Sequence, residues 1–211
     1  MRGGLVVLTA ALVAAPGSAH AGRTFYGWLY GTEVMPERGV ELQSWLTEEN
    51  KQDSAEDSWL LDPLVGITDQ LEIGFPIEFL WERTEPAMAG DPPKVIDRFN
   101  RFGVEARYRF VTQDPVDAPA VVPLVRVGID RLIADRGAVR PSADVVLSYE
   151  TGIVHVVADV GFYAELGASG GDTYELRPGA GVSFLAVEQA DLRFGAEVYS
   201  EVKLKNGDDS W

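Results

Sequence analysis

Apolar and polar residues alternate along most of this chain. Between Leu71 and Glu82, six apolar residues occupy every second position, and glutamate, glycine or proline fill most of the positions between them. An alternation of period two places one set of side chains on a single face of a β-strand, whereas a helix would scatter them around its circumference. The segment is therefore predicted to be a strand with one apolar face.

The same alternation recurs in nine further segments. It is clear in 101–110, 139–151, 154–166, 174–186 and 192–201, and weaker in 24–34, 39–49, 58–67 and 120–132. We find no competing helical pattern, so the chain is predicted to be all-β, with about ten visible strands of roughly 10–14 residues. Globular strands average five or six residues, whereas about 9–11 residues are needed to cross a bilayer as a tilted strand.

The polar face distinguishes a membrane barrel from a soluble one. It is rich in glycine and mixes arginine with acidic residues, as expected of a crowded lumen, and aromatic residues gather near strand ends, where membrane interfaces place them. We expect an antiparallel up-and-down transmembrane β-barrel with its apolar face toward lipid. The alternative is a soluble periplasmic or secreted β-barrel that binds an apolar ligand.

Connections between the strands are predicted to differ in length. Short turns are expected at 35–38, 68–70, 151–152 and 187–191, and longer connections at 50–58, 84–98 and 167–172. Outer-membrane barrels have tight turns at one end and open loops at the other.

Two of these turns also predict strand register. A two-residue turn at Thr151-Gly152 would set Ser148 opposite His155 and Asp144 opposite Asp159. A three-residue loop at 68–70 would set Ile67 opposite Leu71.

The N-terminus has the form of a secretory signal. Arg2 is followed by the apolar run Leu5–Ala15, and Ala19 and Ala21 supply the small residues that precede a cleavage site. We predict that residues 1–21 are removed and that 22–211 form one outer-membrane domain. No stretch is long and apolar enough for a transmembrane helix.

Composition excludes several kinds of chemistry. With 33 acidic and 18 basic residues the formal charge is −15, which argues against nucleic-acid binding. The chain has no cysteine and only two histidines, so disulfides and cysteine-ligated metals are excluded and no cofactor is expected.

Two short motifs suggest a family. Residues 59–74 contain Gly-Ile-Thr-Asp-Gln-Leu-Glu, which resembles the "glycine, aliphatic, Thr-Asp, any, Leu-Glu" hairpin of Gram-negative outer-membrane proteins, including porin-like transporters and the MetA-pathway phenol-degradation family. Residues 35–45 are similar to the opening strand of those proteins. The resemblance implies a transport-related barrel and carries over no catalytic residue.

The two ends of the chain depart from the barrel pattern. Trp211 is terminal and aromatic, as in barrel-closing strands, but positions 203, 205, 207 and 209 are Lys, Lys, Gly and Asp where apolar residues belong. If 24–34 spanned the membrane, the 35–38 turn would lie on the loop side. We therefore expect that 24–34 does not span fully, and that an intact barrel has about 12 strands with the C-terminal strands missing here.

The inward face carries the candidate chemistry. Its acids outnumber its arginines, which fits either a salt-bridged lumen or a water-filled path with a mild preference for cations. Asp144 and Asp159 are expected to share an arginine or to hold a cation. The candidate network comprises Arg107, Arg109, Arg126, Asp130, Arg140, Asp144, His155, Asp159, Glu175, Arg177, Arg193 and Glu197.

A hydrolytic site is the least favoured interpretation. Ser148, His155 and Asp159 could form a triad, but they face the lumen rather than lipid, and no Gly-x-Ser-x-Gly run surrounds the serine. We therefore predict a pore, a small-solute transporter or a structural barrel rather than an enzyme.

The expected partners follow from this location. They are outer-membrane lipid or lipopolysaccharide and small solutes or cations. An acidic patch, Glu48, Glu49, Asp53, Glu56 and Asp57, is expected in a loop.

Overall fold

A single antiparallel sheet makes up the fold. The computed structural model describes residues 26, 29–50, 54–84, 94–111, 121–187 and 192–204, and within them it contains eleven strands and no helix. The all-β antiparallel class is therefore confirmed.

The strands are β1 (Val40–Asn50), β2 (Ser54–Thr68), β3 (Leu71–Gly74), β4 (Ile77–Thr84), β5 (Lys94–Arg109), β6 (Val121–Leu132), β7 (Val139–Thr151), β8 (Val154–Glu165), β9 (Thr173–Val187), β10 (Leu192–Tyr199) and β11 (Val202–Leu204). Most strands overlap the predicted segments, although β2 and β5 begin several residues earlier and the predicted strand at 71–82 is divided into two.

Two pairs of these strands are single rows with an interruption. β3 and β4 both lie between β2 and β5, and they are separated by Phe75 and Pro76. Proline has no N–H to give to a ladder, which interrupts the row there. β10 and β11 likewise both pair with β9. The eleven strands thus form nine rows.

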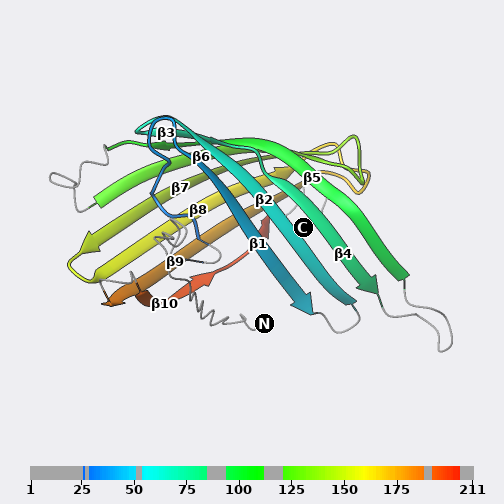
Figure 1. The fold of residues 1–211 in the computed structure, drawn as a ribbon. Helices are drawn as coiled ribbons and strands as arrows, with labels where there is room; N and C mark the ends of the chain where they lie inside the picture. The colour runs from blue at the N-terminus through cyan, green and yellow to red at the C-terminus, as the bar shows by residue number, and fades with distance from the viewer. Residues whose placement is uncertain are drawn as a thin grey trace.

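The rows follow chain order in a curved meander (Figure 1). β1 and β10 are its two edges, and no ladder joins them among the described residues. The sheet is barrel-like in its curvature, but the predicted closed barrel is not formed by these residues.

The two faces of the sheet have the predicted polarity. On β8, Val160 and Phe162 face outward and are 49% and 43% exposed, whereas His155 and Asp159 face inward and are 2% and 6% exposed. Exposed large apolar side chains likewise lie on the outer face of the other long strands, and buried charged residues gather on the inner face.

Residues 24–34 were predicted as a weak strand, and this prediction is wrong for the part described. Tyr26 and 29–34 form no strand and lie against the inner face of the sheet. Tyr26, Leu29 and Val34 are each at most 7% exposed. Their apolar side chains are buried against the concave inner face of the sheet, which we call the lumen.

The predicted β7–β8 register is wrong by two residues. The turn is Gly152-Ile153 and pairs Thr151 with Val154. Gly152 has a φ of 55°, which glycine adopts without strain at the first position of a two-residue hairpin turn.

The corrected register changes the predicted side-chain pairs. His155 lies opposite Glu150, and Ser148 lies opposite Val157. Asp144 lies opposite Gly161 and not opposite Asp159.

The loop at 68–70 is also shorter than predicted. Thr68 pairs with Leu71, leaving a two-residue turn, and an irregularity between Gly66 and Thr68 takes up the extra residue. The Thr68 hydroxyl accepts hydrogen bonds from the N–H groups of Gln70 and Leu71 at 3.2 and 3.0 Å. These bonds satisfy donors that a wider loop would leave open.

The predicted acidic loop is largely strand. β1 and β2 remain paired up to Asn50 and Ala55, so Glu48, Glu56 and Asp57 belong to the ladder. The connection predicted at 84–98 is shorter for the same reason, because β4 and β5 are paired up to Thr84 and Lys94.

The two ends of the sheet are distinct. We call the end with residues 35–39, 69–70 and 152–153 the turn end, and the end with 133–138 and 166–172 the loop end. The Arg38 N–H donates to the Gly66 carbonyl at 3.0 Å, which fixes the 35–39 turn at the turn end. The 35–38 turn thus lies at the same end of the sheet as the other short turns. This is possible because 29–34 does not form a row of the sheet before it.

Gly66 lies where this turn meets β2. A methyl group at Gly66 would overlap the Pro36 carbonyl oxygen, whereas a methyl group at Gly170 would meet open space. We expect Gly66→Ala to lower the free energy of unfolding by about 1–3 kcal/mol and Gly170→Ala to leave it nearly unchanged. Urea titration of the purified protein measures both; equal effects would contradict this account of the turn.

Candidate functional site

The N-terminal segment enters the concave side of the sheet and fills it at the turn end. We call Tyr26 and 29–35 the plug. The Tyr26 hydroxyl lies 3.1 Å from Nδ1 of His155 and donates to the His155 carbonyl at 3.2 Å. The Thr32 and Ser148 hydroxyls hydrogen-bond each other. The plug is thus tied to β7 and β8 by side-chain contacts.

Backbone groups of the plug are held by carboxylates. The Met35 N–H donates to Glu72 at 2.6 Å, and the Leu29 N–H donates to Glu197 at 3.3 Å. An irregular segment has no strand ladder to pair its backbone, so these carboxylates act as the acceptors for its N–H groups.

The plug also packs against a part of β9 where glycines leave room for it. A methyl group at Gly179 would overlap Leu29, and one at Gly181 would overlap the Tyr26 ring. Beside this surface Leu29 and Val34 join an apolar cluster with Leu124, Val146 and Val157. The glycines of β9 therefore create the room that the plug occupies.

Tyr30 connects the plug to the charged centre of the lumen. Its ring lies below two guanidinium groups, 4.4 Å from the Arg126 Cζ and 5.2 Å from the Arg107 Cζ. A cation over an aromatic face is attractive, and more so where water is excluded.

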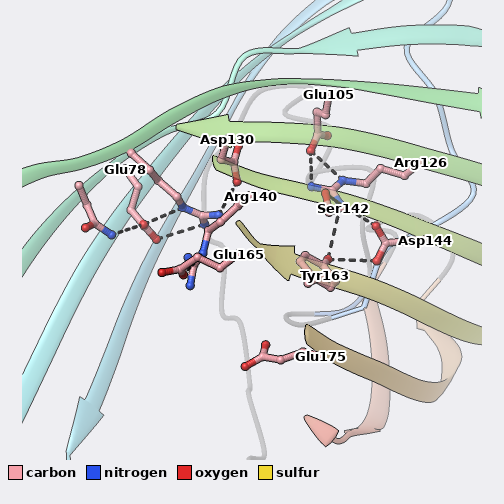
Figure 2. Close-up of polar contacts among 12 residues, drawn as sticks. Glu78, Glu105, Arg126, Asp130, Arg140, Ser142, Asp144, Tyr163, Glu165 and Glu175 are labelled. Atoms are coloured by element: carbon pink, nitrogen blue, oxygen red, sulfur yellow. Dashed lines mark hydrogen bonds and ion pairs between the residues drawn. The ribbon is translucent and has the colours of Figure 1, made fainter. Parts of the chain in front are cut away.

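Buried ion pairs form the centre of the lumen (Figure 2). Arg126 contacts Glu105 at 2.7 Å and Asp144 at 2.6 Å, and Arg107 contacts Glu105 at 2.6 Å. The Tyr163 hydroxyl donates to the second oxygen of Asp144 at 3.0 Å. Each of these charges is at least 94% removed from water, so the pairs replace lost hydration.

A cavity of about 300 Å³ lies toward the loop end. Three arginines line it, and each is bound to carboxylates: Arg101 to Glu78 and Asp130 at 2.7 Å, Arg140 to Glu165 at 2.9 Å, and Arg177 to Glu175 and Glu201 at 2.7 and 3.3 Å. The six acids of the lining, which include Glu56, exceed its three arginines by three charges.

Loop contacts border this end of the sheet. Asp135 accepts hydrogen bonds from the Ser169 N–H at 2.6 Å and the Gly137 N–H at 3.3 Å. These bonds favour the ionised carboxylate and lower the pKa of Asp135. They link the β6–β7 loop to the β8–β9 loop.

The structure divides the twelve candidate residues into three groups. Arg107, Arg126, Asp144 and Asp159 lie in the centre; Asp130, Arg140, Glu175 and Arg177 line the cavity; Arg109, His155, Arg193 and Glu197 lie on the inner face nearer the turn end. Ala19 and Ala21 lie outside the described residues.

Two central residues were not predicted. Asp62 is 2% exposed and lies 3.6 Å from Arg107, and Tyr30 comes from the plug. The phase of the alternation in 58–67 could have placed Asp62 inward. No pattern could have placed Tyr30, because its position depends on a segment that forms no strand.

The serine and histidine of the possible hydrolase triad both contact the plug. Ser148 hydrogen-bonds Thr32, and His155 hydrogen-bonds Tyr26. The two residues are not directly opposite each other, since Ser148 lies opposite Val157 and His155 opposite Glu150.

In the described part of the chain, no group of three or more His, Asp or Glu side chains could hold a metal ion. None of the described residues forms a helix able to cross a membrane. Comparison with known proteins found no matching family model, no similar curated protein and no similar solved structure.

Removing the central guanidinium should be costly. Arg126→Met leaves Glu105 and Asp144 buried without their main cation, so we expect the free energy of unfolding to fall by about 3–5 kcal/mol. Arg38, whose side chain is 90% exposed beside Glu37, is the control, and Arg38→Met should change stability by at most about 0.5 kcal/mol. Equal losses in urea titrations would show that the central network does not stabilise the sheet.

Proposed function

We propose that this protein is an outer-membrane β-barrel that acts as a small-solute pore, with its lumen closed at the turn end by its own plug. The observation that carries the proposal is the inverted polarity of the sheet. Large apolar side chains are exposed along the outer face, while buried charges occupy the inner face. An exposed apolar surface of this extent in water would be an aggregation hazard, and lipid is the environment that suits it.

The soluble alternative requires the opposite arrangement. A soluble barrel that binds an apolar ligand would direct its apolar face inward and its charges to water. Here Glu72, Glu105 and Asp144 are inside and nearly inaccessible. The inner face therefore offers no apolar ligand site of the expected kind.

The plug and the cavity suggest how a solute path would operate. Tight turns face the periplasm in outer-membrane barrels, so the turn end and its plug are assigned to the periplasmic side. The cavity at the loop end would then open to the outside, and its excess of three carboxylates would favour cations over anions. Passage through the lumen would require the plug to move.

A structural role is the second candidate. It is favoured by the pairing of every arginine that lines the cavity with a carboxylate, because a lumen filled by such pairs need not conduct. Conductance separates the two candidates.

Membrane integration can be tested with matched lysine substitutions. Val160 is 49% exposed in the middle of the outer face of β8, and Val121 is 53% exposed on the outer face at the turn-end margin of β6. Val160→Lys should destabilise the inserted barrel by about 2–4 kcal/mol and Val121→Lys by at most about 1 kcal/mol, because the penalty depends on depth in the bilayer.

The readout is extraction of cell membranes with buffer and then with detergent. We expect the parent protein and Val121→Lys to require detergent, and Val160→Lys to be depleted from the membrane fraction. Release of the parent protein by aqueous buffer alone would overturn the membrane proposal.

Pore activity can be tested by displacing the plug. A leucine at Gly181 would overlap the Tyr26 ring and should expel the plug, whereas a leucine at Gly170 meets open space. In planar bilayers we expect Gly181→Leu to conduct more than the parent and Gly170→Leu, with cations preferred. If no variant conducts, the structural role is supported instead.

A further inference from the structure

Asp159 is an anomaly in the charged centre of the lumen. It is 6% exposed, it forms no ion pair among the described residues, and its Oδ1 has no hydrogen-bond partner there. The backbone of Tyr30, in the plug, donates a hydrogen bond to its carboxylate. An ionised carboxylate in this position would be a buried charge with no cation of its own.

The surrounding elements cannot neutralise it. The guanidinium group of Arg126, on β6, acts electrostatically on Asp159, but its nitrogens already contact Glu105 and Asp144. Both oxygens of Asp144, on β7, are taken by Arg126 and Tyr163. On β9, the residue opposite Asp159 is Gly179, which has no side chain.

The overall charge balance points the same way. Around Arg107 and Arg126, the described residues include five carboxylates that are each at most 6% exposed: Asp62, Glu72, Glu105, Asp144 and Asp159. Five ionised carboxylates and two guanidinium groups would leave three uncompensated charges in a site closed to water, which is unfavourable. A metal ion would need several oxygen ligands, and the described residues form no such group.

We propose that Asp159 binds a proton when the plug is seated and that loss of this proton releases the plug. This inference rests on the proposed function, because it assigns a control to the same lumen. With the plug seated, Asp159 is the neutral acid. With the plug withdrawn, water reaches the carboxylate and the ionised form is favoured. Seating is therefore stable at low pH and is lost as pH rises, with one proton released for each plug withdrawn.

The chain allows a direct measurement of plug position. It has no cysteine, so an introduced thiol is unique. Val34 is 1% exposed within the seated plug, whereas Glu37 is exposed in the adjacent turn. We would measure the maleimide labelling rates of Val34→Cys and Glu37→Cys in detergent from pH 5 to 9. Their ratio cancels the ordinary titration of the thiol.

The expected result is a ratio that rises with pH, by at most about tenfold per pH unit because one proton is linked to release. In an Asp159→Asn background the ratio should stay at its low-pH value. Asp130→Asn is the matched control, because Asp130 is also a buried inner-face carboxylate but pairs with Arg101 at the cavity, so the rise should remain. If Asp159→Asn does not fold, Asp159→Leu removes the same charge.

A flat ratio in the parent protein, or a rise that persists without Asp159, would overturn the proposal. Its failure can be distinguished from failure of the proposed function, because labelling in detergent requires neither membrane location nor conduction. If buffer alone extracts the protein but the labelling ratio still depends on pH, the role of Asp159 is supported and the membrane barrel is rejected.

Discussion

The pairing of charges inside the lumen is the constraint on which the rest of this structure depends. The outer face of the sheet is apolar, so the inner face must receive the polar side chains and must keep them stable with little water. Arg126 meets this requirement by joining β5 and β7 through Glu105 and Asp144. These three strands are neighbours in the sheet, and Arg126 lies directly opposite Asp144, so one guanidinium group reaches both carboxylates.

The plug is held by hydrogen bonds to the polar side chains of the same inner face. Its backbone N–H groups donate hydrogen bonds to carboxylates on β3 and β10. Its hydroxyl groups form hydrogen bonds with side chains on β7 and β8. The segment therefore replaces water inside the lumen without forming a ladder. Most of its polar contacts are single hydrogen bonds, and Tyr30 adds cation–π contacts with Arg107 and Arg126 of the central network.

Sequence alone predicted the strands and their faces because the alternation of period two is a local property of the chain. The polarity of β8, for example, was predicted correctly from His155 to Phe162, whereas Ala164, predicted to face outward, is buried. Register was less predictable, because the turn at Gly152-Ile153 differs by one residue from the alternative at Thr151-Gly152 and both preserve the faces. The plug was missed because its position depends on Gly179 and Gly181, about 150 residues away in the sequence.

The nine-row meander also determines how its two edges relate to each other. Successive rows reverse direction, so with an odd number of rows β1 and β10 both run from the turn end to the loop end. A ladder formed directly between them would have to be parallel, whereas every ladder in the described sheet is antiparallel. The two edges thus cannot form an antiparallel ladder with each other. Each edge could form one with a strand that runs from the loop end to the turn end.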